Sequence, residues 1–274
     1  MLTPEWIMSA AKSETRVIGI GSLGGSEKVG SSVKMAHAMG YGVPQIFNDA
    51  YELALALKEG RIDAAVRGDM DSKESMNAVK KVFHLDHVAR LAMLQPCGGK
   101  IFFLAPVGVD EGSTVQEKLE MVRLAAILLR RIGEEPSIGI MSGGRNTDLG
   151  RSPVVDRSIN EAEQIVSVLR REGFDAEDIQ IMIEEAVQSK NLIIAPDGIS
   201  GNLIFRCIHL VSGGRSMGAP ILNIDRIFID TTRAKVNYLD SIALASMLVD
   251  GALPADGGHP VTLRNELPMG RKRS

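Results

Sequence analysis

A hydroxyl, a guanidinium and a carboxylate follow one another closely late in the chain, at Thr231-Thr232-Arg233 and Asp240. They come after the apolar run 226–230, which predicts a buried strand, and before a predicted helix that carries the aspartate. A hydroxyl and a guanidinium can bind and polarise a carbonyl or phosphoryl oxygen, and a carboxylate one to two turns later can accept a proton. Thr232, Arg233 and Asp240 are therefore the candidate catalytic residues. The structural alternative is a helix-capping threonine, a surface arginine and a helix-side aspartate.

A glycine-rich loop after another predicted strand is a candidate anion site. It reads Ser142-Gly143-Gly144-Arg145. Consecutive glycines let backbone N–H groups converge on an anion, and Arg145 adds a planar guanidinium fork. A purely structural turn is the alternative. The loop Ser212-Gly213-Gly214-Arg215 has the same composition but follows a helical pattern, which favours a helix end with a solvated arginine.

A second strand-to-helix junction lies at residues 191–202. The apolar run 191–195 predicts a strand, and the loop that follows leads into an apolar helical pattern. Junctions of this kind are where α/β proteins bind anionic ligands. The ligand-binding candidates from this loop, together with one arginine after a third predicted strand, are Asp197, Ser200, Gly201, Asn202 and Arg67.

The segment Gly19-Ile-Gly21-Ser-Leu-Gly24 matches the dinucleotide fingerprint, and Asp49 could bind the ribose. A glycine turn needed only for strand-to-helix packing explains the same residues, so a dinucleotide-binding oxidoreductase is kept as an alternative function. Cys97 and Cys207 have no metal-type spacing, and no metal site is predicted. No cofactor can be assigned.

Composition excludes several functional classes. The net charge is -3 and aromatic residues make up 4% of the chain, which argues against a nucleic-acid partner. No apolar run reaches the ~18 residues of a spanning helix, and no signal segment precedes the first strand. We expect a cytoplasmic protein without a membrane partner.

Strands and helices alternate along the chain with short connections. Predicted strands at 16–20, 43–47 and 62–66 are each followed by a helix, which is typical of a mostly parallel sheet with helices on both faces. A break at 95–99 interrupts this order, and a second set of strands starts at 101–105. The sequence therefore predicts an α/β protein with two lobes.

Longer motifs resemble known families. Pro196-Asp197-x-x-Ser200-Gly201-Asn202, then 218–222, then Asp230-Thr-Thr-Arg233, resembles the C-terminal half of the phosphate acetyl/butyryltransferases. The segments 142–157 and 195–202 resemble more closely the MtxX family, also called methanogenesis marker protein 4, which is labelled as a methyltransferase subunit in methanogenic archaea. The resemblance covers roughly residues 16–250.

This resemblance implies a fold and a division of the chain. The expected fold is a two-lobe, three-layer αβα architecture of the isocitrate/isopropylmalate-dehydrogenase-like and phosphotransacetylase-like type, with the active cleft between the lobes. Residues 1–92 plus 224–274 would form the first lobe and residues 93–223 the second. Relatives of this type are usually dimers, so a homodimer is expected.

The resemblance also implies roles for particular residues. Thr232 and Arg233 match a Ser-Arg pair of the phosphotransacetylases, and Asp240 falls one residue later than their thiol-deprotonating aspartate. Asn77 stands where those enzymes carry a phosphate-binding arginine. Without that cation the resemblance does not imply the use of coenzyme A, unless Arg67 or Arg145 binds the phosphate instead.

The expected function is a group transferase of this superfamily, a methyltransferase by family label, that binds a small anionic, phosphate-like or acyl-phosphate-like ligand. The alternative is a non-catalytic, ligand-sensing subunit of a methyltransferase complex. Asn77 favours the subunit, whereas the retained Thr232, Arg233 and Asp240 favour the enzyme.

Overall fold

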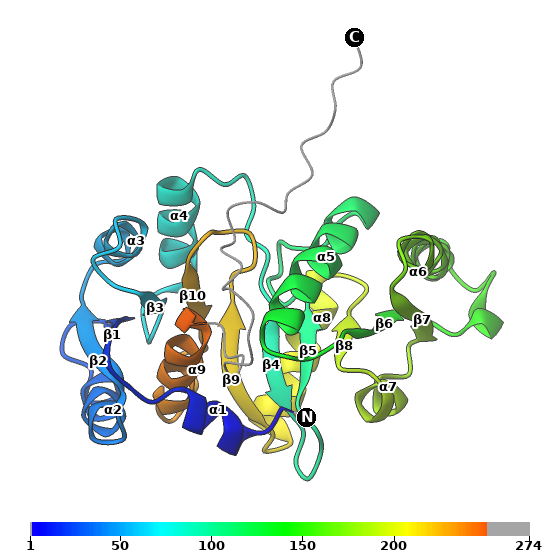
Figure 1. Cartoon of the computed structure of the whole chain (residues 1–274). Coiled ribbons are helices and arrows are strands. Elements are labelled where there is room, and N and C mark those ends of the chain that lie inside the picture. Colours follow the sequence, from blue (N-terminus) through cyan, green and yellow to red (C-terminus); the bar gives the residue numbers. More distant parts are fainter. Residues whose placement is uncertain (1, 251–274) are drawn as a thin grey trace.

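The computed structural model describes residues 2–250 (Figure 1). Ten strands in this part of the chain form one sheet in the order β2-β1-β3-β10-β9-β4-β5-β8-β6-β7. Their bounds are β1 Ser13–Gly21, β2 Tyr41–Phe47, β3 Ala64–Val66, β4 Ala92–Gln95, β5 Phe102–Ala105, β6 Ser137–Met141, β7 Asp175–Gln180, β8 Leu192–Ile194, β9 Arg215–Pro220 and β10 Ile227–Asp230.

The sheet consists of two parallel sets that run in opposite directions. Strands β2, β1, β3 and β10 form the first set, and β5, β8, β6 and β7 form the second. Between them, β9 and β4 pair antiparallel with each other and with both sets. The predicted mixed α/β class is confirmed. The two central antiparallel strands were not expected, because one is interrupted by glycine and the other is only four residues long.

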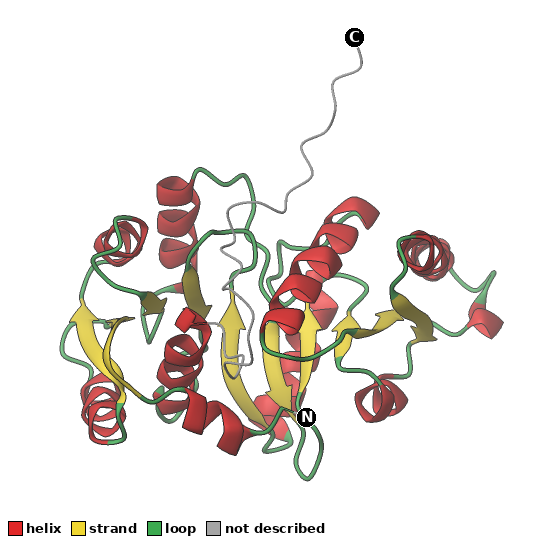
Figure 2. Ribbon diagram, in the orientation of Figure 1, coloured by secondary structure: helices red, strands yellow, loops and turns green. Residues whose placement is uncertain are grey.

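Helices cover both faces of the sheet (Figure 2). Their bounds within the described residues are α1 Pro4–Ala10, α2 Glu27–Ala38, α3 Ala50–Lys58, α4 Ser72–Phe83, α5 Val115–Arg131, α6 Pro153–Arg171, α7 Ile183–Ser189, α8 Gly198–Arg206 and α9 Leu239–Asp250. In Figure 1, α3, α4, α5 and α6 lie over one face, and α1, α2, α7 and α9 lie over the other.

Local sequence explains where these helices begin. Ser26 and Asp71 accept backbone N–H groups of α2 and α4, because a short polar side chain before a helix can satisfy its first donors. The segment 153–157 is the first part of α6. Pro153 stands at the first helical position, where its fixed φ angle suits the helix and its missing N–H is not needed.

A single apolar cluster runs across the junction between the two strand sets. It contains Val66 of β3 and Ile229 of β10, and also Ile138 of β6 and Ile194 of β8, all of them fully buried or nearly so. The chain leaves the first set after α4 and returns to it with β10. This is the order that the predicted lobe boundaries assume. The boundaries themselves remain a prediction, and residues 251–274 of the predicted first lobe lie outside the described residues.

No helix within residues 2–250 is both long and apolar enough to cross a lipid bilayer.

Candidate functional site

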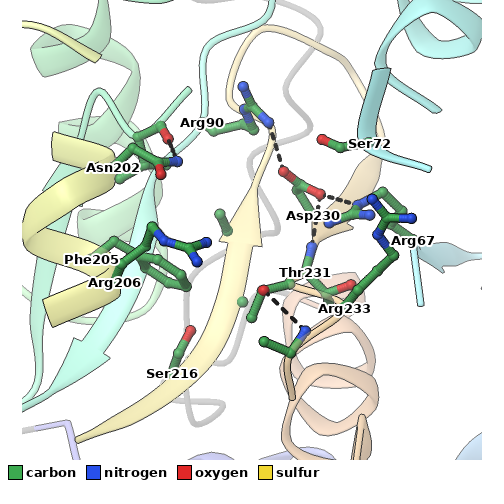
Figure 3. Close-up of a pocket in the computed structure, with 15 residues that line it drawn as sticks. Arg67, Ser72, Arg90, Asn202, Phe205, Arg206, Ser216, Asp230, Thr231 and Arg233 are labelled. Carbon is green, nitrogen blue, oxygen red and sulfur yellow. Dashed lines mark hydrogen bonds and ion pairs between the residues drawn. The ribbon is translucent and has the colours of Figure 1, made fainter. Parts of the chain in front are cut away.

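A cavity of about 370 Å³ opens where the two strand sets meet (Figure 3). Its walls come from the loop after β3, the start of α4, the segment before β4, the loop after β5, α8, β9 and the connection between β10 and α9. The lining residues are Arg67, Ser72, Arg90, Val107, Asn202, Phe205, Arg206, Ser216, Gly218, Ala219, Asp230, Thr231, Thr232, Arg233 and Ala234. Four of these side chains are arginines, and a single one is a carboxylate.

Arg67 is placed by a close contact between two loops. Gly68, with φ +65°, follows it, and a Cβ at this glycine would lie 1.9 Å from the carbonyl oxygen of Gly21. Only glycine allows the loop after β3 to approach the end of β1 so closely. The Arg67 side chain is thereby buried, donating to the carboxylate of Asp230 and to the carbonyl oxygen of Met70.

Asp230 holds a second arginine on its other oxygen. Arg90 Nη1 donates to Asp230 Oδ2 at 2.7 Å, and Arg90 Nε donates to Glu111 in the loop after β5. Glu111 in turn accepts the N–H of Gly108 at 3.0 Å. A buried chain of charges, Arg67–Asp230–Arg90–Glu111, therefore connects the first strand set to the loop after β5. Buried charges persist only when they are paired in this way.

The two carboxylates of this chain respond differently to their surroundings. Burial disfavours the charged form of Asp230, but Arg67 and Arg90 together outweigh burial, and the pKa of Asp230 lies below its usual value. At Glu111, burial exceeds the effect of its one arginine partner, and the pKa lies above its usual value. Asp230 is consequently a fixed anion that aligns two arginines and is a poor proton acceptor.

The residues after Asp230 form a turn whose polar groups are partly free for a ligand. Thr231 Oγ1 donates to the carbonyl oxygen of Gly68 at 2.7 Å, and Thr232 Oγ1 accepts the N–H of Ala234 at 3.2 Å. The hydroxyl proton of Thr232 thus remains available. Arg233 is 56% exposed in its side chain, and its nearest carboxylate is that of Asp71 at 3.6 Å.

Helix α8 supplies the opposite wall. Figure 3 shows Phe205 and Arg206 reaching in from α8 on the side away from Asp230 and Arg233. Arg206 makes no ion pair with any residue between 2 and 250. Asn202 Nδ2 donates to the carbonyl oxygen of Val107 at 2.8 Å, so its own amide oxygen is available to the cavity.

Four of the predicted site residues are brought together in this cavity, namely Thr232, Arg233, Arg67 and Asn202. Arg90 and Arg206 were missed. Arg206 lies inside an apolar helical pattern that predicted only packing, and Arg90 precedes a strand that was not expected at this position. The spacing of four residues between Asn202 and Arg206, which places both on one face of a helix, was the signal that could have identified Arg206.

The loop Ser142–Arg145 does not line the cavity. Its strand, β6, lies five positions from β10 in the sheet, roughly 24 Å at the usual strand spacing. Its polar groups are also used within the loop: Ser142 Oγ donates to Gly144 O, and the backbone N–H of Arg145 donates to Asp148.

Three residues of the second junction position α8 rather than line the cavity. Asp197 caps the helix by accepting the Ser200 N–H at 2.8 Å. A Cβ at Gly201 would lie 1.9 Å from the carbonyl oxygen of Pro106, so glycine allows the helix to rest on the loop after β5.

Asp240 is in the first turn of α9 and is not a lining residue. Arg215 Nε and Nη2 donate to its two oxygens at 2.7 and 2.9 Å. Burial raises the pKa of Asp240, but Arg215 and Lys235 outweigh burial and hold it below its usual value. The prediction that Arg215 is a solvated arginine after a helix is wrong, because it begins β9 and is half-buried against this aspartate.

The glycine fingerprint near the first strand has a packing explanation. A Cβ at Gly19 would lie 2.5 Å from Ile62 Cδ1, and Asp49 caps α3 by accepting the Glu52 N–H at 2.7 Å. Neither residue lines the cavity. Among residues 2–250, no cluster of three or more histidine, cysteine or acidic side chains could hold a metal ion.

Comparison with known proteins places the chain in a family. No family model matches it. A protein of Methanosarcina mazei named "Putative methyltransferase mtx subunit X" is 41% identical over 219 residues, which are 79% of this chain and 78% of that protein. A Methanosarcina acetivorans protein of the same name is 43% identical over 196 residues, 72% of this chain and 70% of its own. A Methanopyrus kandleri protein named as an uncharacterized methyltransferase is 37% identical, covering 71% of this chain and 78% of its own.

Solved structures share the fold at low sequence identity. A branched-chain phosphotransacylase from Enterococcus faecalis has a TM-score of 0.66 at 16% identity, covering 86% of this chain and 99% of its own. The EutD phosphotransacetylase from Staphylococcus aureus has a TM-score of 0.68 at 11% identity, covering 91% of this chain and all of its own. These likenesses show a phosphotransacetylase-like fold. The identity to the methanogen proteins, spread over most of both chains, shows more: the chain belongs to the mtx subunit X family.

Proposed function

We propose that this chain is a group transferase that binds a small phosphate-like or acyl-phosphate-like anion in the cavity described above, which would be the cleft between two lobes of isocitrate/isopropylmalate-dehydrogenase-like type. The observation that carries the proposal is the cluster of Arg67, Arg90, Arg206 and Arg233 around a single carboxylate, Asp230. Arginine forks match the oxygens of phosphate and carboxylate groups. The name of the relatives supports methyl transfer as the reaction.

Each side chain around the cavity would have a distinct role in such a transferase. Arg206, which makes no ion pair with any described residue, and Arg233, which has only a surface contact of 3.6 Å with Asp71, would bind the anion from opposite walls. Arg67 and Arg90, aligned by Asp230, would add fixed positive charge, and the Thr232 hydroxyl would donate to an oxygen of the ligand. Asp240 is the proposed proton acceptor, and it can act only if Arg215 releases its carboxylate.

A second candidate is a ligand-sensing subunit without catalysis of its own. It is favoured by the state of the acids: Asp230 is fixed between two arginines, and Asp240 is bound by Arg215 outside the cavity. Asn77 is exposed on α4 and does not line the cavity, so no cation stands at the position expected from the phosphotransacetylases. The relatives are named as a subunit, and this supports a methyltransferase complex as a partner.

A homodimer is the other proposed assembly. Helix α8 and the segment after it expose Ile199, Leu203 and Val211, which are 60%, 59% and 81% exposed. Large apolar side chains that are exposed on one helix and the segment after it suit contact with a second copy.

The experiment that tests anion binding compares two arginines. Sulfate is titrated calorimetrically into the wild type, Arg233→Ala and Arg145→Ala. We expect Arg233→Ala to weaken binding at least tenfold, because it removes a charge-assisted contact of the kind worth about 1.5–3 kcal/mol. Arg145→Ala should bind within twofold of the wild type, since its loop does not line the cavity. Equal binding by wild type and Arg233→Ala, or no binding by the wild type, would refute the proposal.

A further inference from the structure

One buried cation next to the cavity forms no direct ion pair with any of the described residues. Lys235 is 7% exposed, and its Nζ donates to the carbonyl oxygen of Ser216 at 2.6 Å and to Ser241 Oγ at 3.1 Å. Both partners are neutral. An ammonium group has three donors and one full charge, so one donor is left without a partner, and the charge is offset only by Asp240, which forms no ion pair with it.

Of the charged and titratable groups around Lys235, Asp240 is engaged with Arg215, whereas Nε2 of His209 is buried without a hydrogen-bond partner. Asp240, in the first turn of α9, is bound at both oxygens by Arg215 at the start of β9. His209, in the segment Cys207–Val211, lies with Nδ1 3.0 Å from the carbonyl oxygen of Gly214, and burial keeps its pKa below the usual value. Tyr41 of β2 is a neutral phenol within the field of the Arg215–Asp240 pair. Burial lowers the pKa of Lys235 to about 8. The charge of Arg215 also lowers this pKa, and the charge of Asp240 raises it.

The amine lies directly behind the cavity wall. Ala234, its chain neighbour, and Ser216, whose carbonyl oxygen it contacts, both line the cavity. The backbone N–H of Lys235 also donates to the carbonyl oxygen of Thr232 at 3.2 Å, which ties the lysine to the turn that carries Arg233. A buried charge without a partner is costly, and proteins keep such charges where a ligand or another group completes the pair.

We propose that the anion bound in the cavity is the counter-ion of Lys235, so that binding of the anion requires this amine to be protonated. The inference rests on the proposed function and adds to it a residue and a proton. Lys235 acts through the wall and does not touch the ligand, so it is a positioning and charge-balancing residue. Its effect should appear in the pH dependence of binding and in proton uptake, which a structural role alone would not produce.

The experiment uses sulfate, because sulfate stays a dianion across the whole pH range. Sulfate is titrated into the full chain by calorimetry from pH 6.5 to pH 9.5, in two buffers of different ionisation enthalpy at each pH. Deprotonation of Lys235 removes one positive charge near the ligand, so we expect affinity to fall roughly 5- to 30-fold between pH 7 and pH 9.5. The buffer comparison should show net uptake of a fraction of a proton per sulfate near pH 8.

Two variants sharpen the assignment. Lys235→Met should bind sulfate weakly and equally at all pH values, whereas Lys12→Met, which removes an exposed lysine at the end of α1, should keep the wild-type pH profile. If Lys235→Met does not fold, the wild-type profile and its proton uptake still decide the question. Sulfate binding that depends on Arg233 but is constant from pH 6.5 to 9.5, without proton uptake, would overturn this inference and leave the proposed function standing. Absence of binding at every pH would overturn both.

Discussion

Asp240 is bound by two nitrogens of one arginine, and this arrangement decides what the loss of its charge should do. Asp240→Asn keeps the shape of the side chain but weakens both contacts with Arg215. Because Asp240 is 19% exposed while Arg215 is 38% exposed, the pair is only partly buried, and we expect a loss of about 1–2 kcal/mol in the free energy of unfolding. Sulfate affinity at pH 7 should stay within a few fold of the wild type. Urea unfolding and calorimetry provide the two measurements.

The matched control is Glu172→Gln, which removes a carboxylate from an equally bidentate contact with Arg123 on the surface. Exposed pairs contribute about 0–1 kcal/mol, so this variant should unfold almost like the wild type. A stable Asp240→Asn protein that binds sulfate normally but has lost group-transfer activity would restore Asp240 to the role of general base. Such a result would favour the enzyme over the ligand-sensing subunit.

Part of the site could be predicted from residue types and the local order of elements. The rest depends on the order of the strands in the sheet, which the sequence does not reveal. Thr232, Arg233 and Arg67 could be predicted because each follows a strand of the first parallel set, whose ends meet at one edge of the sheet. Ser142–Arg145 also follows a parallel strand, but one in the second set, which runs the other way. Nothing in the sequence showed that two antiparallel strands separate these sets.

At the scale of elements, α8 depends on backbone contact with the loop after β5. Added Cβ atoms at Gly198 and Gly201 would lie 1.7 Å from Gly108 O and 1.9 Å from Pro106 O. Both carbonyls belong to the segment 106–108, in which the N–H groups of Val107 and Gly108 donate to Glu111, the partner of Arg90. We expect Gly201→Ala to destabilise the protein by about 1–3 kcal/mol through overpacking, and to weaken sulfate binding as α8 shifts.

Gly30→Ala is the control for Gly201→Ala, and we expect it to raise the stability rather than lower it. Gly30 lies inside α2, and a Cβ at this position would meet nothing within 4 Å. Alanine is favoured over glycine in a helix by up to about 1 kcal/mol, so this variant should be slightly more stable. Thermal unfolding of both variants tests the pair. A Gly201→Ala protein as stable as the wild type would show that α8 does not need this close approach.

For the whole molecule, the buried lysine predicts an unusual alkaline stability profile. The pKa of Lys235 is about 8 in the folded protein, below the ~10.4 of an unfolded lysine. Between these values the unfolded chain binds more protons than the folded one, so the free energy of unfolding should rise with pH, by roughly 2 kcal/mol between pH 8 and 9.5. Burial raises the pKa of Tyr238 to about 12, so this tyrosine opposes the trend only above pH 10.

Urea unfolding at pH 7.5, 8.5 and 9.5 measures the profile, without sulfate so that binding does not contribute. Lys235→Met should flatten it. A wild type whose stability falls steadily over this range, in parallel with the variant, would contradict the placement of a charged amine in the interior.

The class of the fold was more predictable than the details of its centre. Strand–helix alternation depends on local periodicity, so the residues of β1, β2 and α2 showed it directly. Within the order β10-β9-β4-β5, the step from β9 to β4 depends on a pairing between segments more than 100 residues apart, such as Met93 with Gly218. Local sequence patterns do not indicate which distant strands pair.

The reversal of direction at β9 and β4 gives the cavity two walls of different kinds. One wall consists of loop ends fixed by a shared carboxylate, and it would tolerate little change without losing its arginines. The other is the face of α8, where Asn202, Phe205 and Arg206 point inward from a regular helix. Substitutions of Asn202 or Phe205 on that face would alter the size and polarity of the cavity, while the two arginines held by Asp230 would stay in place. Descendants of one ancestral chain could therefore diverge in substrate by changing a single helix.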